Sequence, residues 1–214
     1  MGSTGTSSNW RIENAPAWDY LGDGEGRDNI NTGYFDGVTM MRADTNLNDW
    51  IDEAASYSSW EQRILQSYVQ DSSINSKLRD DPTYWDDEVG NLDTIIATHT
   101  LDKDTTLFSG LSNKSVANVD LSTIKTGDTF SIPTYLSTSP DPVYASGYAL
   151  GSGNSEPTVL EIHAPKGTNI AKTFYDDVYG TEGVLGRHTT FRRIGDKIGS
   201  VNGRGVRVVV LEVV

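Results

Sequence analysis

Four residues in the second half of the chain have types and spacing that suit chemistry on a sugar bond. Ser137, Thr138 and Ser139 follow one another at the end of a short stretch with a strand pattern, and Glu182 is an isolated acid in an expected loop further along. Hydroxyls can hold a carboxylate in place without adding a competing charge. If the loop brings Glu182 to the hydroxyls, the carboxylate and the hydroxyls together can hold and polarise a nucleotide-sugar bond.

Each of these residues also has a plainer interpretation. Glu182 could be an ordinary loop acid in an acidic protein. Ser139 or Asp141 could cap a helix that begins at Pro142, since short polar side chains are preferred there. For the serines the two interpretations are compatible, with Ser137 in the reaction centre and Ser139 in a structural role.

A second pair of residues stands four apart in a stretch with a helical pattern. Asn75 and Arg79 fall on one face of that helix, where an amide and a guanidinium can converge on one ligand. An ion pair between Arg79 and the adjacent Asp80 or Asp81 is the alternative.

The first half of the chain has the apolar periodicity of helices. Apolar residues recur at helical spacing around residues 47–54, 60–68, 74–78 and 89–96. Ser58 and Glu61 form a capping-box pattern at the start of the second stretch, and Pro82 follows the third. We expect residues 45–100 to form a helical lobe with its aromatic residues in the core.

The second half has the shorter patterns of strands. These occur at residues 105–108, 128–132, 135–137, 158–163, 190–194 and 205–214. A short helix is expected at 142–150. Helices first and strands later predict an α+β fold, with residues 101–214 as a β-rich core.

Residues 1–44 are polar and rich in Gly, Asn and Asp, with single aromatic residues that we expect to dock this extension on the body. The acids around Gly24 lack the spacing of a calcium-binding loop. His99, His163 and His188 lie far apart, without the spacing of a metal site. The sequence therefore predicts no metal.

Charge and composition limit the possible partners. The 214 residues carry 17 Lys and Arg against 30 Asp and Glu, a formal net charge of -13, which repels nucleic-acid phosphates and anionic membranes. The sequence has no cysteine, which excludes disulfides and thiolate chemistry. The first residues lack the pattern of a secretory signal, and no apolar run has membrane-spanning length. We expect a soluble monomer that binds neither nucleic acid nor membrane directly.

Six segments together suggest a family. They are YVQDSSINSKLR at 68–79, LFSGL at 107–111, YLSTS at 135–139, VLEIHAPKGT at 159–168, EGVL at 182–185 and TFRR at 190–193. In order and spacing these segments resemble the mono-ADP-ribosyltransferases of bacterial-toxin type, from about residue 45 to the end of the chain.

The resemblance implies a fold, a substrate and a partner. The fold is a split core of two antiparallel β-sheets set roughly at right angles, with an N-terminal helical subdomain beside the cleft where NAD lies. NAD is the substrate, and ADP-ribose passes to a macromolecular acceptor, expected to be a protein.

The resemblance also implies roles for individual residues. Glu182 would stabilise the positive charge that develops on the ribose as nicotinamide leaves, and Ser137 would orient it. Thr138 and Ser139 would support the strand and the turn into the next helix. Asn75 and Arg79 would bind the NAD phosphates.

Two positions depart from the family pattern. Ser109 stands where the family has an arginine on its first strand, and losing that charge should weaken NAD binding by about ten- to a hundredfold unless Arg79 or Arg187 compensates. Gly110 beside it would let the backbone approach the nucleotide, or would simply end the strand.

The other departure is Gly180, two residues before Glu182, where related enzymes carry Glu or Gln to activate the acceptor. Asp176, Asp177 or the Thr181 hydroxyl would then assist, or the acceptor would need little activation, or transfer to protein has been lost.

Two alternatives to a transferase stay open. Ser109 and Gly180 also fit a degenerate member of the family that binds a nucleotide or a protein without chemistry. NAD hydrolysis without an acceptor is the other. By analogy with the family, we expect a bacterial effector or a protein that a bacteriophage delivers into its host.

Overall fold

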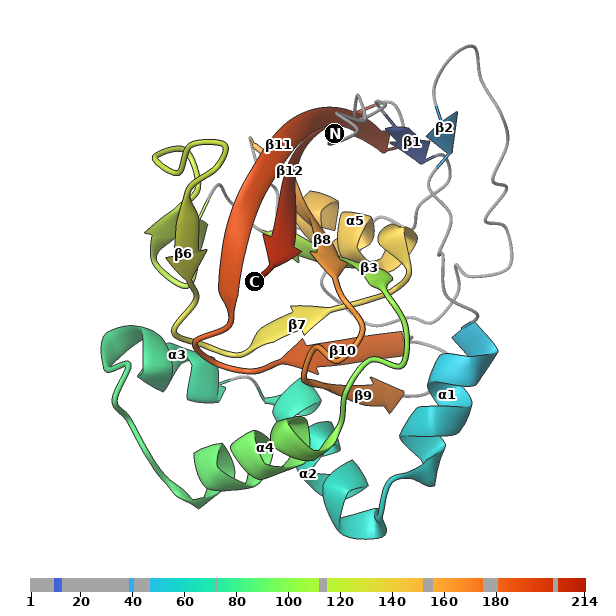
Figure 1. The fold of residues 1–214 in the computed structure, drawn as a ribbon, viewed down its shortest axis with the longest axis vertical. Helices are drawn as coiled ribbons and strands as arrows, with labels where there is room; N and C mark the ends of the chain where they lie inside the picture. Colours follow the sequence, from blue (N-terminus) through green and yellow to red (C-terminus); the bar gives the residue numbers. More distant parts are fainter. Residues whose placement is uncertain are drawn as a thin grey trace.

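In the computed structural model, two short strands come first along the chain, four helices follow, and most strands come after them (Figure 1). The structure describes residues 10–12, 39–40, 47–71, 73–111, 115–151, 156–174, 181–201 and 204–214. The α+β class predicted from the sequence is confirmed.

Four helices form the lobe that precedes the main strands. They are α1 (Leu47–Ser56), α2 (Ser59–Gln70), α3 (Ser73–Asp80) and α4 (Asp87–Thr98). The capping box at α2 is present, because Ser58 Oγ accepts the Glu61 N–H at 3.3 Å and Glu61 Oε2 accepts the Ser58 N–H at 2.8 Å. Asp86 caps α4 by accepting the Val89 N–H at 2.9 Å.

The larger sheet has seven strands in the order β2-β1-β11-β12-β8-β3, with β6 paired to β11. Its strands are β1 (Trp10–Ile12), β2 (Thr39–Met40), β3 (Thr105–Leu111), β6 (Thr129–Ser131), β8 (Thr158–Ala164), β11 (Thr190–Val201) and β12 (Arg204–Val213). This sheet is mixed rather than wholly antiparallel, since β1 is parallel to both β2 and β11, and β8 is parallel to β12. The chain leaves β8 for the other sheet before it reaches β12, and such a crossover permits a parallel pair.

The smaller sheet is antiparallel and consists of β7 (Leu136–Thr138), β10 (Thr181–Leu185) and β9 (Ile170–Phe174), with β10 in the centre. In Figure 1 its strands run across the view, whereas β11 and β12 run up it. The two sheets meet where Phe108 of β3 and Ser139 exchange two main-chain hydrogen bonds of 2.7 Å. A hairpin of β4 (Ser115–Val116) and β5 (Val119–Asp120) follows β3.

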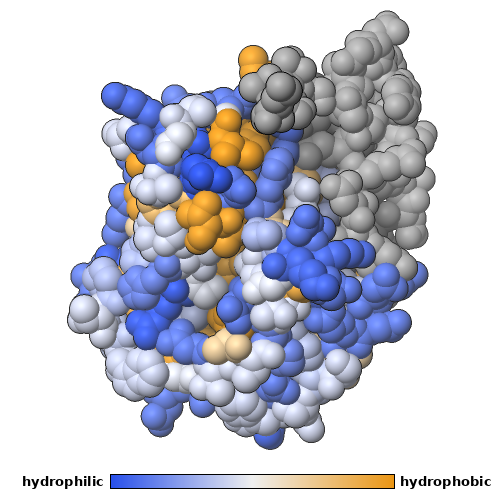
Figure 2. All heavy atoms as spheres, viewed as in Figure 1, coloured by the Kyte–Doolittle hydropathy of each residue, from blue (hydrophilic) through white to orange (hydrophobic). Residues whose placement is uncertain are grey.

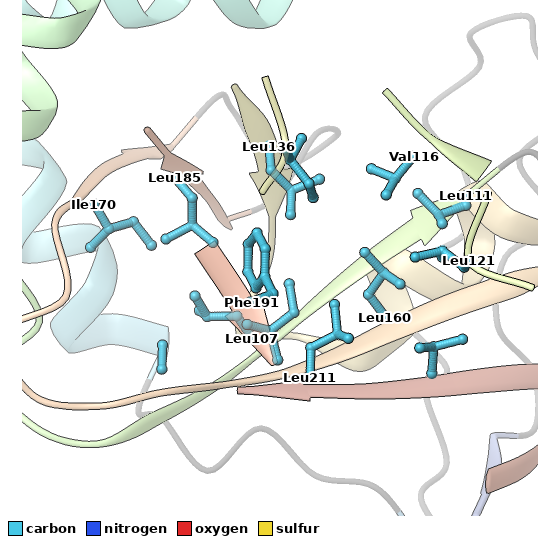
Figure 3. Close-up of a cluster of buried hydrophobic side chains, with 14 of the residues drawn as sticks. Leu107, Leu111, Val116, Leu121, Leu136, Leu160, Ile170, Leu185, Phe191 and Leu211 are labelled. Carbon is cyan, nitrogen blue, oxygen red and sulfur yellow. The ribbon is translucent and has the colours of Figure 1, made fainter. Parts of the chain in front are cut away.

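Apolar side chains fill the space between the two sheets. Figure 3 shows leucines of β3, β8 and β12 facing Leu136, Ile170 and Leu185 of the smaller sheet. A second cluster lies between the outer face of the larger sheet and α5 (Pro142–Gly151), and a third between the smaller sheet and helices α2 to α4. The smaller sheet is therefore covered on both faces.

The polar N-terminal part contributes to the larger sheet through β1, which pairs with the end of β11. The sequence pattern predicted a docked polar extension here, without a strand. The boundaries proposed at residues 44 and 100 stay predictions.

The described surface in Figure 2 is mostly hydrophilic, with scattered hydrophobic side chains. None of the helices in the described ranges is long and apolar enough to cross a membrane.

Candidate active site

The smaller sheet brings Ser137 and Glu182 together. Antiparallel pairing sets Ser137 of β7 opposite Val184 of β10 and Thr138 opposite Gly183. The Ser137 hydroxyl lies near enough to the Glu182 carboxyl group to lower its pKa. Glu182 is the second residue of β10, so the expectation of an acid in a loop was wrong. The rigid strand, rather than a swinging loop, delivers the carboxyl group to the hydroxyl.

The two side chains differ in their access to solvent. Ser137 is exposed, whereas Glu182 is only 9% exposed. Burial raises the pKa of Glu182 from 4.5 to about 7, and the nearby Ser137 hydroxyl opposes that rise. Near neutral pH the carboxyl group therefore exists in both its ionised and neutral forms.

Trp50 of α1 fixes the backbone at Glu182. Its indole Nε1 donates a hydrogen bond of 3.2 Å to the Glu182 carbonyl oxygen. The ring packs against Gly183, where an added Cβ would lie 2.8 Å from Trp50 Cζ2 and 2.7 Å from Ile170 Cδ1. A glycine after the acid is therefore needed for this packing.

Tyr68 of α2 is a residue of the site that the sequence assigned only to the core. Its hydroxyl lies 3.2 Å from Ser137 Oγ, and its ring is 1% exposed. Burial raises the Tyr68 pKa, and the nearby Glu182 raises it further. The signal was present in the sequence, since Tyr68 opens the segment 68–79 that contributes to the family resemblance.

The Asn75 side chain contacts residues beside Ser137, whereas the Arg79 side chain has a different partner. The Asn75 Nδ2 donates to the Tyr68 hydroxyl at 2.9 Å, and its Oδ1 accepts the Tyr135 N–H at 3.1 Å. Arg79 is exposed, and its Nη2 donates to Ser76 Oγ at 2.6 Å. Contacts within the protein occupy the Asn75 amide, and convergence of the pair on one ligand stays a prediction.

Thr138 and Ser139 have structural partners. Thr138 Oγ1 donates to the Gly183 carbonyl at 2.8 Å, which ties β7 to β10. Ser139 Oγ accepts the Asp141 N–H at 3.0 Å, and Asp141 Oδ1 accepts the Val143 N–H at 2.9 Å. These bonds shape the turn that leads into α5.

Ser109 and Gly110 have structural partners as well. The buried Ser109 Oγ donates a 2.8 Å hydrogen bond to the Ser137 carbonyl. At Gly110 an added Cβ would lie 2.0 Å from the Ala145 carbonyl oxygen of α5, so its close neighbour is a helix. Gly110 does not end the strand, because β3 continues to Leu111. A role for either residue in NAD binding stays a prediction.

Arg187 is held by a carboxylate of α4. Its guanidinium donates to Asp93 at 2.8 and 3.0 Å, and the same Asp93 contact raises the Arg187 pKa. Of the two cations expected to compensate for Ser109, Arg187 is thus engaged and Arg79 lies at the surface.

The residues expected to activate the acceptor are only partly described. Thr181 is buried in β10, at 5% exposure, which does not favour contact with an acceptor. Gly180, Asp176 and Asp177 fall outside the described residues. Across the described ranges no group of three or more His, Asp and Glu side chains is placed to hold a metal ion.

Comparisons with known proteins agree with this architecture. No family model and no curated protein sequence matches the chain. Among solved structures, an ADP-ribosyltransferase from Clostridium botulinum, in a triclinic crystal form, is similar at a TM-score of 0.59 and 16% identity, over 80% of this chain and 98% of its own. The fold is that of the bacterial ADP-ribosyltransferase toxins.

Two further structures with the ADP-ribosyltransferase fold support this statement. The toxin Plx2a from Paenibacillus larvae matches at a TM-score of 0.59 and 19% identity, over 78% of this chain and 90% of its own. C3stau2 from S. aureus, solved with NAD, matches at a TM-score of 0.55 and 20% identity, over 78% and 92%. The resemblance found in six short segments therefore identified the ADP-ribosyltransferase fold correctly.

Proposed function

We propose that this protein is an NAD-dependent mono-ADP-ribosyltransferase that acts as a monomer and transfers ADP-ribose to a macromolecular acceptor, namely a protein. The observation that carries the proposal is the buried Glu182 carboxyl group beside the exposed Ser137 hydroxyl, on neighbouring strands of the smaller sheet. C3stau2, whose structure was solved with NAD, supports the choice of substrate.

The chemistry follows from the charge that develops during bond cleavage. When the bond between nicotinamide and ribose breaks, its electron pair leaves with nicotinamide and the ribose becomes positively charged. An ionised Glu182 that accepts a hydrogen bond from a ribose hydroxyl stabilises this state more than the ground state. Its low-dielectric surroundings strengthen that interaction, and Ser137 keeps the carboxylate oriented.

The diphosphate needs a cation, and Ser109 cannot supply it. Arg79 is the candidate that we favour, because its guanidinium is exposed and its partner is the neutral Ser76. Arg187 would first have to leave Asp93. The protein acceptor would belong to a cell that receives this protein as a bacterial effector or from a bacteriophage.

A binding module without chemistry is a second candidate. Ser109 favours it, since its hydroxyl is used to join β3 to β7 at the position where the family resemblance predicts a phosphate-binding arginine. A third outcome is NAD hydrolysis, in which water takes the place of the acceptor.

Release of nicotinamide from NAD distinguishes these functions. Wild type should release nicotinamide, and Glu182→Gln should lower the rate by at least about a hundredfold while the protein stays folded, because it removes a charge aimed at the transition state. Label on a protein from an added extract indicates transfer, and release in buffer alone indicates hydrolysis. Calorimetric binding of NAD without release would favour the binding module. A protein that neither binds NAD nor releases nicotinamide would overturn the proposal.

A further inference from the structure

Asp93 of α4 lies outside the candidate active site but holds the ends of both strands that form it. The Tyr135 hydroxyl donates to Asp93 Oδ1 at 2.8 Å, and Tyr135 immediately precedes β7. Arg187, which follows β10, donates to both Asp93 oxygens at 2.8 to 3.2 Å. One carboxylate therefore joins the start of β7 to the end of β10.

These two ends face each other in the sheet. Leu136, the first residue of β7, pairs with Leu185, the last residue of β10. Ser137 follows Leu136, and Glu182 lies three residues before Leu185. The hydrogen bonds that fix the register at this end therefore also fix the separation of the Ser137 hydroxyl and the Glu182 carboxyl group.

A second connection runs from Tyr135 to the same hydroxyl. The Tyr135 N–H binds Asn75, Asn75 binds the Tyr68 hydroxyl, and Tyr68 lies 3.2 Å from Ser137 Oγ. The rings of Tyr68 and Tyr135 pack edge to face, with centroids 5.8 Å apart. Tyr68 is also close enough to Glu182 for the carboxylate to raise the Tyr68 pKa, so a displaced Tyr135 would disturb both the hydroxyl and the surroundings of the carboxyl group.

We infer that Asp93 is a positioning residue for the reaction at Glu182, acting through Tyr135 and Arg187 on the two strands of the site. This inference rests on the proposed function. The carboxylate suits this role because its hydrogen bonds to Arg187 are charge-assisted and paired. Such bonds are stronger than neutral ones and fix the relative orientation of the two groups. At 31% exposure of its side chain, Asp93 does not need to touch NAD to act in this way.

The alternative is that Asp93 only docks α4 on the sheet. The two roles differ in what they do to Glu182. If the strands loosen, water reaches the carboxyl group and its pKa falls from about 7 toward 4.5, because burial is the cause of the rise. Simple docking would change the melting temperature and leave the Glu182 pKa where it is.

The test compares Asp93→Ala and Tyr135→Phe with wild type. Tyr135→Phe removes one hydroxyl and keeps the ring, so it provides a second result if Asp93→Ala fails to fold. Asp87→Ala is the matched control, since Asp87 is an exposed acid of the same helix. The Glu182 pKa is measured by carboxyl-carbon NMR in each protein, without NAD, and kcat and KM for nicotinamide release are measured over pH.

We expect both variants to lower the Glu182 pKa by one pH unit or more, and the acid limb of the kcat profile to move with it. At a fixed pH well above both pKa values, Asp93→Ala should lower kcat by about ten- to a hundredfold, as small misplacements of reacting groups do, with KM changed by less than about threefold. Asp93→Asn keeps an acceptor for Tyr135 and should restore part of kcat.

Two results would separate this inference from the proposed function. A Glu182 pKa that is unchanged in the folded variants would overturn the positioning role, whether or not the protein turns over NAD. A wild type that releases no nicotinamide would instead remove the proposed reaction, and with it the role of Asp93 in catalysis.

Discussion

The Ser109 hydroxyl donates a 2.8 Å hydrogen bond to the main-chain carbonyl of Ser137. This bond joins β3 of the larger sheet to β7 of the smaller sheet, next to the main-chain bonds between Phe108 and Ser139. Ser137 is thus held through its backbone by one sheet while its side chain reaches Glu182 on the other strand. The position where the family resemblance predicts an arginine thus supports the backbone of the site.

Ser109→Ala should therefore cost stability and not affinity for NAD. The change leaves a buried carbonyl without its donor, which costs about 1–3 kcal/mol. Urea unfolding measures this loss, and calorimetry with NAD should give a Kd within about threefold of wild type.

Ser131→Ala is the control for Ser109→Ala, because Ser131 Oγ makes the same kind of bond, 2.8 Å to the His188 carbonyl, at an exposed position where water replaces it. It should cost less than half as much. Unchanged stability with a large rise in Kd for Ser109→Ala would mean that the hydroxyl binds the ligand.

Glu182→Gln should stabilise the protein at alkaline pH while it abolishes activity. The folded-state pKa of about 7 lies above the ordinary 4.5, so burial of the ionised form destabilises the protein. This cost is absent below about pH 4.5, grows as pH rises, and is complete above about pH 7. A displacement of that size corresponds to roughly 3 kcal/mol, at 1.36 kcal/mol for each pH unit.

Unfolding in urea at pH 4.5 and at pH 8.5 checks the Glu182 prediction. The variant should match wild type at pH 4.5 and exceed it at pH 8.5, while nicotinamide release by wild type rises with pH through about 7. An equal difference in stability at both pH values would contradict a buried titrating carboxyl group.

The parts of the fold that depend on local pattern were predicted well. The four helices follow from apolar spacing, and the α2 capping box from Ser58 and Glu61 alone. Most strands of the larger sheet were located to within a few residues. Strands β9 and β10 were missed, because Lys172 and Thr173 of β9 and Thr181 to Gly183 of β10 interrupt the apolar pattern expected of a strand.

The parts of the site that depend on contacts between distant segments were predicted less well. Spacing correctly put Asn75 and Arg79 on one helix, but it could not show that Tyr68 and Tyr135 would occupy the Asn75 amide. Asp93 gave no signal, since its partners come from segments that meet it only in the folded chain. Family resemblance brought Ser137 and Glu182 together where periodicity could not.

Gly110→Ala should be strongly destabilising. The added methyl group would lie 2.0 Å from the Ala145 carbonyl and 2.9 Å from the Ala149 main-chain nitrogen, and neither backbone atom can rotate away. Helix α5 must then shift from the sheet, at a cost of about 1–3 kcal/mol or more.

Gly195→Ala is the control for Gly110→Ala, because nothing lies within 4 Å of a Cβ at that position of β11. Its unfolding free energy should stay close to that of wild type. If both alanines proved neutral in urea, α5 would have to pack differently from the arrangement described above.

Glu61 should stabilise the start of α2 at neutral pH and lose this effect in acid. The Ser58 side chain, followed by His99, lowers the pKa of Glu61 from 4.5 to about 2. A folded-state pKa below the ordinary value means that the stabilisation is present above about pH 4.5 and is lost as pH falls toward 2. Glu61→Gln keeps a capping side chain but loses the charge that faces His99.

The Glu61→Gln variant should therefore be less stable than wild type at pH 6, by about 0.5–2 kcal/mol as for other helix caps, and the difference should shrink as pH falls from about 4.5 toward 2. Glu156→Gln is the control, an identical exchange at an exposed position outside the helices, and should show no such convergence. Because α2 carries Tyr68, the variant should also lower nicotinamide release at pH 6, since Tyr68 contacts Ser137. If Glu61→Gln lowers stability but leaves nicotinamide release unaltered, the capping box stabilises the helix without affecting the active site.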